Sequence, residues 1–285
     1  MKNNVNLQDA NAFAFGNAGV SAVGGDLILQ AGGDITQSAA VTIVGTTSIT
    51  AGANAITLDN VDNDFGGVVS LSNSGANDVS VRDSNTLQVG TTGVGSGAFV
   101  LNAVSGIDII GDVTLSGIVT IDADTDTDAA GSFSIADGVT FNFGNSNIDI
   151  TITASDINLN STGVLQSNGG AIILQPSTAA RTIALEDGTG DFSLSAAELN
   201  RIITTGVVTI GRADGSGTIS VGSLGAVNLA ATSYDLTLRG SAAPVVFNLG
   251  AGDSLTLADG KTLTLGGGGS ITSPGTLAKS ATSLI

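Results

Sequence analysis

Residues 132–144 read Ser-Phe-Ser-Ile-Ala-Asp-Gly-Val-Thr-Phe-Asn-Phe-Gly, and residues 254–266 read Ser-Leu-Thr-Leu-Ala-Asp-Gly-Lys-Thr-Leu-Thr-Leu-Gly. In both stretches, apolar and polar residues alternate on either side of an Asp-Gly pair. Alternation with a period of two is typical of a β-strand with one buried face, and Asp-Gly is typical of a tight turn. The two stretches therefore predict a strand–turn–strand unit that the chain uses more than once.

The same alternation extends along most of the chain. Apolar–polar–apolar runs, often with Thr or Ser in the middle, recur roughly every 9 residues, and Gly, Asn, Asp and Ser separate them. Examples are residues 41–44, 112–115, 218–221 and 235–238. Long amphipathic helix patterns are absent, so the sequence predicts an all-β protein rather than alternating strands and helices.

Three architectures contain many short, evenly spaced strands: β-sandwiches, membrane barrels and solenoids. A barrel needs aromatic girdles, but the chain has one Tyr and no Trp. A sandwich would not repeat its own sequence. We therefore expect a parallel β-helix, a solenoid that forms a single elongated rod, with coils of roughly 18–27 residues and a length of roughly 50–75 Å. The strict six-residue repeat of left-handed β-helices is absent, which favours a right-handed helix.

We expect residues 26–270 to form the solenoid, with an N-terminal edge or interface segment at 1–25 and a C-terminal edge segment at 271–285. The first segment contains the apolar stretch 11–16, which is not a clear cap for an open end. Open strand edges predict end-to-end self-association. Residues 195–202, Ser-Ala-Ala-Glu-Leu-Asn-Arg-Ile, have the spacing of a capping box. They fit one helical turn packed on the rod or an irregular strand with a loop.

Charge restricts the possible partners. The chain has 25 acidic and 8 basic residues and a net charge of −17. This balance argues against nucleic acid and anionic membrane surfaces, and it favours divalent cations. No apolar run is long enough to predict membrane insertion. His and Cys are both absent, which removes most transition-metal ligands and the usual general base.

The sharpest candidate site is an acidic stretch in which Asp122, Asp124, Asp126 and Asp128 alternate with small residues before Gly131. Calcium prefers six to eight oxygen ligands, often from Asp at every second position near a Gly turn. These four residues are the candidate metal ligands; the alternative is a solvated acidic loop. A weaker candidate is the group formed by Asp59, Asp62 and Asp64. The sequence predicts no required cofactor, and calcium is the candidate bound ion.

Two stretches resemble a known family. Residues 56–71, which include Ile-Thr-Leu-Asp-Asn and Asp-Phe-Gly-Gly-Val-Val-Ser-Leu, look like repeats of large bacterial surface exoproteins of the filamentous-haemagglutinin type. So do residues 191–202, 208–212 and 235–240. The resemblance implies a right-handed β-helical shaft of a giant secreted adhesin, and it offers no catalytic residues. No signal peptide is recognisable at the start, so we expect either that the signal has been removed or that export uses a signal outside this chain.

These observations predict a structural protein and no enzymatic activity. We expect an extracellular or cell-surface β-solenoid, the shaft of an adhesin or a self-assembling filament subunit, with other copies or cell-surface polysaccharide as partners. The first alternative is a calcium-dependent surface-layer subunit. The second is a polysaccharide-active β-helix enzyme, which would need paired carboxylates in a groove.

Overall fold

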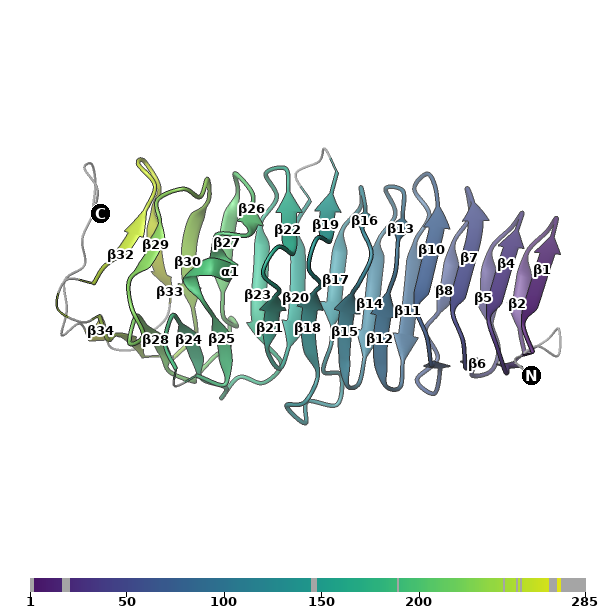
Figure 1. Cartoon of the computed structure of the whole chain (residues 1–285), viewed down its shortest axis with the longest axis horizontal. Coiled ribbons are helices and arrows are strands. Elements are labelled where there is room, and N and C mark those ends of the chain that lie inside the picture. Colours follow the sequence, from purple (N-terminus) through teal and green to yellow (C-terminus); the bar gives the residue numbers. More distant parts are fainter. Residues whose placement is uncertain are drawn as a thin grey trace.

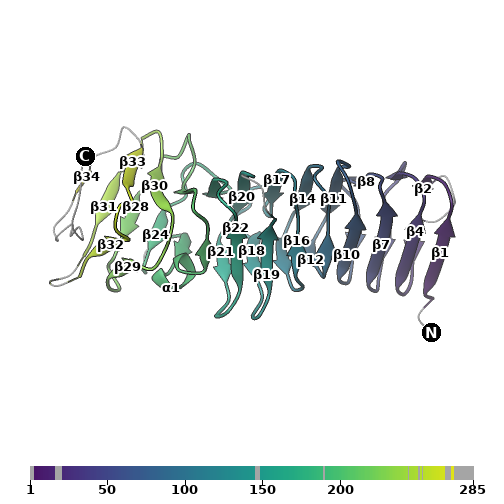
Figure 2. The ribbon, with the colours of Figure 1, turned by 90° about the horizontal axis from the view of Figure 1, so that it is seen from above.

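The computed structural model describes residues 3–16, 21–144, 148–188, 190–242, 244–249, 251, 253–266 and 271–272. Within them the regular secondary structure is almost entirely β-strand, and every strand pairing in its ladders is parallel. The strands stack into one elongated rod, with β1 (Val5–Asp9) and β34 (Ile271–Thr272) at opposite ends of it (Figure 1). The rod stays elongated when turned by 90° (Figure 2). The predicted parallel β-helix is confirmed; the hand in which its coils wind stays a prediction.

Successive strands form three rows along the rod, and up to β24 every third strand returns to the same row. The second row is one continuous ladder of eleven strands. Its strands are β2 (Phe13–Phe15), β5 (Ile35–Gln37), β8 (Ile56–Leu58), β11 (Val79–Asp83), β14 (Phe99–Ala103), β17 (Val119–Asp122), β20 (Ile150–Ala154), β23 (Ile172–Pro176), β27 (Val207–Ile210), β30 (Asp235–Arg239) and β33 (Leu263–Gly266). At a spacing of ~4.8 Å between strands, this ladder is about 50 Å long.

The first row is a continuous ladder from β1 to β26, followed by the separate pair β29–β32. Its strands are β1 (Val5–Asp9), β4 (Leu27–Ala31), β7 (Thr47–Gly52), β10 (Val69–Asn73), β13 (Thr92–Gly93), β16 (Val113–Thr114), β19 (Thr140–Phe143), β22 (Val164–Ser167), β26 (Ile202–Ile203), β29 (Val227–Leu229) and β32 (Leu255–Leu257).

The third row consists of three ladders, of which the middle one joins the first row where Val69 of β10 pairs with Val89 of β12. The ladders comprise β3 (Ala22–Val23), β6 (Thr42–Ile43) and β9 (Asp64–Phe65); then β12 (Thr86–Val89), β15 (Gly106–Ile109), β18 (Ser132–Ile135) and β21 (Ile157–Leu159); then β25 (Phe192–Leu194), β24 (Ile183–Leu185), β28 (Ile219–Val221), β31 (Val245–Phe247) and β34 (Ile271–Thr272).

The core consists of columns of stacked apolar side chains. In the second row, one column runs without interruption through ten coils and all its members are buried. It contains Phe13, Ile35, Ile56, Val79, Phe99, Val119, Ile150, Ile172, Val208 and Leu236. Each fully buried side chain of this size contributes about 1.5–3 kcal/mol of hydrophobic free energy. The alternation that predicts the strands therefore also builds the core, because every second residue points inward.

Corner aspartates connect one coil to the next. Each lies just before a strand or at its first residue, and its carboxylate accepts a hydrogen bond from a backbone N–H of a later coil. The donor occupies the matching position one coil further on, except for Asp156, whose donor is Ser193 within β25. The donor–acceptor distances lie between 2.7 and 3.0 Å. These residues are Asp26, Asp34, Asp78, Asp112, Asp149, Asp156 and Asp235. Part of the acidic surplus therefore serves the fold, because a charge-assisted bond satisfies a donor at each of these corners.

The two similar segments, residues 132–144 and 254–266, do not occupy equivalent faces of the rod. Residues 132–135 form β18 in the third row, whereas 255–257 form β32 in the first row. In both, the Asp-Gly pair lies at the turn with Gly in the left-handed region, at φ 74° for Gly138 and 77° for Gly260. The strand–turn–strand unit therefore fits more than one corner of the coil.

A short helix, α1 (Ala196–Leu199), confirms the helical-turn interpretation of residues 195–202. Ser195 caps its N-terminus, and the reciprocal contact of a capping box is made by Glu198. The helix follows β24 and β25, two strands of the third row that pair with each other only nine residues apart in sequence, Ile183 with Phe192. One extra strand is thus inserted into the third row next to α1.

Side chains of the α1 segment replace a missing strand at the edge of β21. The N–H of Leu159 donates to Oε1 of Glu198 at 3.1 Å, and the carbonyl of Leu159 accepts from the guanidinium of Arg201. A parallel strand would normally satisfy both groups. The α1 segment therefore satisfies the backbone groups of Leu159 at the point where the third row changes from one ladder to the next.

Candidate metal centre

The acidic loop, residues 123–131, lies at the corner between the second and third rows. It leaves β17 at Asp122 and enters β18 at Ser132. Its ends are held together closely: a Cβ on Gly131 would lie 1.9 Å from the carbonyl oxygen of Ala123. The N–H of Ser155, in the following coil, donates to the carbonyl of Gly131 at 2.7 Å. The loop is thus fixed to the rod at its base, which explains the glycine at this position.

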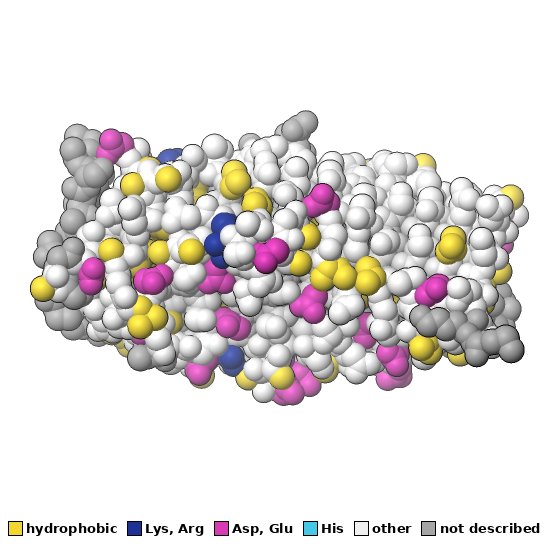
Figure 3. Space-filling view, in the orientation of Figure 1, with side chains coloured by type: hydrophobic (Ala, Val, Ile, Leu, Met, Phe, Trp, Pro, Cys, Tyr) yellow, Lys and Arg dark blue, Asp and Glu magenta, His cyan; other side chains and the backbone are white. Residues whose placement is uncertain are grey.

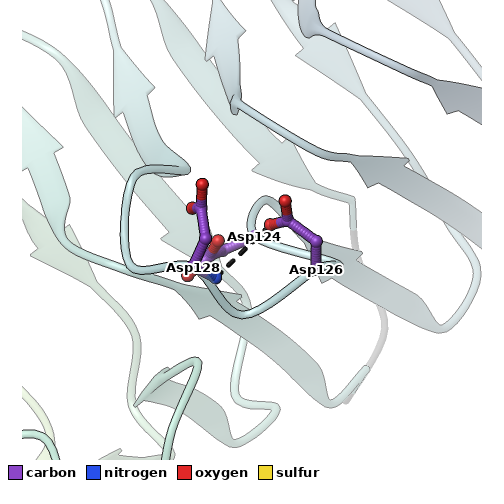
Figure 4. Close-up of side chains that lie close together, drawn as sticks. All are labelled: Asp124, Asp126 and Asp128. Atoms are coloured by element: carbon purple, nitrogen blue, oxygen red, sulfur yellow. Dashed lines mark hydrogen bonds between the residues drawn. The ribbon is translucent and has the colours of Figure 1, made fainter.

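Three carboxylates of the loop converge. One oxygen each from Asp124, Asp126 and Asp128 lie within 4.8 Å of one another. Asp126 and Asp128 are exposed and point the same way from the loop, as Figure 4 shows. At this separation, each pair of like charges repels by about 1 kcal/mol in water and by up to ~4 kcal/mol where solvent is partly excluded.

Asp124 differs from the other two because it is completely buried. Its Oδ2 accepts a hydrogen bond from the hydroxyl of Ser177, a residue 53 positions further along the chain. Its Oδ1 is inaccessible to solvent and has no hydrogen-bond donor. A buried carboxylate oxygen without a donor or cation is costly, because burial removes its water without replacing it.

Asp122, the fourth predicted ligand, is not part of this group. It is the last residue of β17, and its Oδ1 accepts the backbone N–H of Asp124 at 3.2 Å. Burial raises the pKa of Asp122, while that N–H and the guanidinium groups of Arg82 and Arg212 act in the opposite direction. The structure thus brings together three of the four residues, and assigns Asp122 to the turn that starts the loop.

The two neighbouring arginines are directed elsewhere. Arg82 reaches the hydroxyl of Thr125 at 3.4 Å, and Arg212 forms an ion pair with Asp214 at 2.8 Å. Arg212 also donates to the carbonyl of Ser177 at 3.0 Å. Neither guanidinium has a hydrogen bond to Asp124, Asp126 or Asp128 among the bonds of the described residues.

The second acidic group does not converge in the same way. Within the described part of the chain, Asp59, Asp62 and Asp64 do not bring three carboxylate oxygens within range of a single ion. Asp64 instead accepts a hydrogen bond from the side-chain amide of Asn85 at 3.2 Å. This carboxylate connects neighbouring coils, like the corner aspartates.

A shallow hollow lies beside α1. It is lined by Ala196, Ala197, Asn200, Asn228, Ala230 and Ala231. Alanine methyl groups and asparagine amides offer neither a general acid nor a general base. On the face drawn in Figure 3, carboxylates are spread along the rod, and the basic side chains of that face lie in its C-terminal half.

Sequence reasoning missed the corner aspartates and the interaction of α1 with β21. Asp26, Asp78 and Asp235 stand directly before apolar–polar–apolar runs. The sequence alone does not distinguish them from ordinary turn residues. The signal that could have found them is this recurring position, one residue before the strand. The partners of Glu198 and Arg201 lie 39 and 42 residues away, so no local pattern indicates them.

The fold and site define a parallel β-solenoid repeat protein. Residues 2–72 match the model of a family described as "Repeats of unknown function (DUF5649)". The matched segment begins just before β1 and ends within β10. No curated protein and no solved structure matches the chain. Among the described residues, no helix has the length and apolar character needed to span a membrane.

Proposed function

We propose that the chain is a structural rod that works outside the cell, as the shaft of a bacterial surface adhesin or as the subunit of a self-assembling surface filament. The observation that carries this proposal is the continuous eleven-strand ladder of the second row, which gives a stiff, elongated element. The sequence resemblance to filamentous-haemagglutinin-type repeats supports the adhesin context and export.

The first coil offers a surface for end-to-end stacking. Among the described residues, β1, β2 and β3 pair on one side only. Val5 and Leu7 are only partly buried, whereas Leu27 and Leu29 at the matching positions in the next coil are at most 1 % exposed. A further coil on this end would bury Val5 and Leu7 and pair the free edge. We therefore propose that the partner is another copy of the same rod.

Backbone direction indicates which residues of β1 would pair with that copy. The N–H of Val5 donates to the carbonyl of Asp26 in the neighbouring coil at 2.8 Å. Alternate residues of a parallel strand bond to opposite neighbours, so the backbone groups of Asn6 and Gln8 face the free edge. Proline at these two positions would remove only the donors that an incoming strand needs.

Sedimentation velocity tests this part of the proposal. The intact chain is expected to form species larger than one rod, and the double variant Asn6→Pro/Gln8→Pro is expected to sediment as single rods with unchanged circular dichroism. The double variant Asn6→Ala/Gln8→Ala keeps both N–H groups and serves as the matched control. Equal association of the proline and alanine variants would contradict stacking through β1.

A calcium-dependent surface-layer subunit is the second candidate, and the convergence of Asp124, Asp126 and Asp128 favours it. It differs from the first in its assembly, because a layer grows sideways as well as end to end. Two-dimensional lattices that form only with calcium would support it, whereas filaments without lateral order would favour the first. Cell-surface polysaccharide is a proposed partner in either case.

A further inference from the structure

The acidic loop contains more than an excess of exposed carboxylates. Asp126 and Asp128 are exposed, and their Oδ1 atoms accept the N–H groups of Asp128 and Ala130 within the loop. Exposed acidic groups of this kind alone would not indicate a ligand. Asp124 is different: it is fully buried, its Oδ1 has no donor, and one of its oxygens lies within 4.8 Å of an oxygen from each of the other two. We propose that Asp124, Asp126 and Asp128 bind one calcium ion, with Asp124 as the anchoring ligand.

The chemistry of the site favours calcium over other metal ions. All three side-chain ligands are carboxylates, and the chain contains neither His nor Cys. Hard oxygen ligands suit calcium and magnesium, but magnesium requires a regular octahedron and retains most of its water. Calcium tolerates an irregular set of six to eight oxygens, so three carboxylates from one loop, completed by water, match its requirements.

The position of Asp124 gives the ion a structural role. The loop belongs to the coil of β17, whereas Ser177, which donates to Oδ2 of Asp124, follows β23 two coils further on. An ion on Asp124 would therefore fix the exposed part of the loop to a residue that already connects several coils. We infer that calcium binding stiffens this corner of the rod and raises the thermal stability of the folded chain.

Isothermal titration calorimetry on the full chain tests the site, with calcium and then magnesium at constant ionic strength. We expect one calcium ion with a dissociation constant on the order of 10⁻⁵–10⁻³ M, and much weaker binding of magnesium. Asp126→Asn and Asp128→Asn are both exposed changes that should leave the fold intact. Their combination is expected to weaken calcium binding at least tenfold and to remove the increase in Tm on adding calcium.

Asp62→Asn is the matched control, since it removes an exposed carboxylate from the acidic group that does not converge. Its calcium affinity should equal that of the unaltered chain. The proposal is overturned if about 10 mM calcium gives neither binding heat nor a change in Tm. It is also overturned if the double variant binds as tightly as the unaltered chain, or if Asp62→Asn loses binding equally. Each outcome is independent of whether the rods stack.

Discussion

At the scale of single residues, Asp83 links the stability of the rod to pH. Asp83 is fully buried at the end of β11, and its two carboxylate oxygens accept the N–H groups of Asn85 and Phe65. Burial raises the pKa of Asp83 to about 6, above its ordinary value of 3.8, although the two N–H donors act against the increase. The folded chain therefore binds more protons than the unfolded chain between these two values.

The sign of the pH effect follows from this difference. The contribution of Asp83 to stability is greatest below pH ~3.8 and is lost as the pH rises toward about 6. Asp83→Asn does not titrate, so the Tm of the unaltered chain minus that of the variant should be larger near pH 4 than at pH 7. Differential scanning calorimetry across this range measures the change.

Asp137→Asn is the control with the opposite sign. The pKa of Asp137 is lowered, first by the hydrogen bond from the Ser161 hydroxyl and then by the N–H of Thr162. Its contribution is present above the unfolded pKa and is lost in more acidic solution. The Tm difference for this variant should therefore shrink as the pH falls. A difference for Asp83→Asn that also shrinks would contradict the assignment of Asp83.

Close stacking of the coils leaves no room for a Cβ at some glycines. A Cβ on Gly117 would lie 1.7 Å from the carbonyl oxygen of Gly97 in the preceding coil, whereas a Cβ on Gly93 would meet no atom within 4 Å. Gly117→Ala should therefore reduce the free energy of unfolding by about 1–3 kcal/mol. Gly93→Ala should change it by less than about 0.5 kcal/mol. Denaturant unfolding measures both changes, provided that the variants have the m-value of the unaltered chain. Equal losses for the two variants would contradict the close contact of Gly117 with the preceding coil.

At the scale of elements, α1 stabilises the rod through Glu198. This carboxylate accepts the N–H of Leu159 at 3.1 Å and the N–H of Ser195 at 2.8 Å. Glu198→Ala would leave both donors without their partner, and we expect a loss of about 1–3 kcal/mol. Ser195→Ala removes the helix cap and the hydroxyl bond to Oε2 of Glu198 but keeps that carboxylate, and it should cost about 1 kcal/mol.

Amide hydrogen exchange separates the two roles of Glu198. Exchange at Leu159 should become faster in Glu198→Ala, because its N–H loses the carboxylate. It should change little in Ser195→Ala, which keeps Glu198. If both variants accelerate exchange at Leu159 equally, α1 stabilises this edge of β21 only by its presence and not through this hydrogen bond.

The elements also show where sequence reasoning succeeds and where it stops. Period-two alternation predicts the strands because one face of each strand is buried, and the capping-box spacing predicts α1 because its hydrogen bonds are local. Asp122 does not join its three neighbours because β17 extends to it and its carboxylate bonds to the N–H of Asp124. That arrangement depends on where the strand ends, which the alternation of Asp and small residues does not indicate.

At the scale of the whole molecule, coil length varies along a rod of constant architecture. Coils near the N-terminus repeat every 20 to 22 residues, as Thr46 to Asp26 and Asn4 to Asp26 show. Between β23 and β27 the spacing grows, because Ile172 pairs with Val208. The additional residues form one extra strand of the third row and α1, while the second row continues unchanged. The apolar column of the second row therefore continues past the insertion, which is accommodated in the third row and in α1.

Electron microscopy of the purified chain tests the central claim most directly, because it shows whether solenoid rods join at their ends. We expect unbranched filaments for the intact chain, and single rods about 50 Å long for Asn6→Pro/Gln8→Pro. Single rods of the intact chain at every concentration, or filaments that persist in the proline variant, would contradict it.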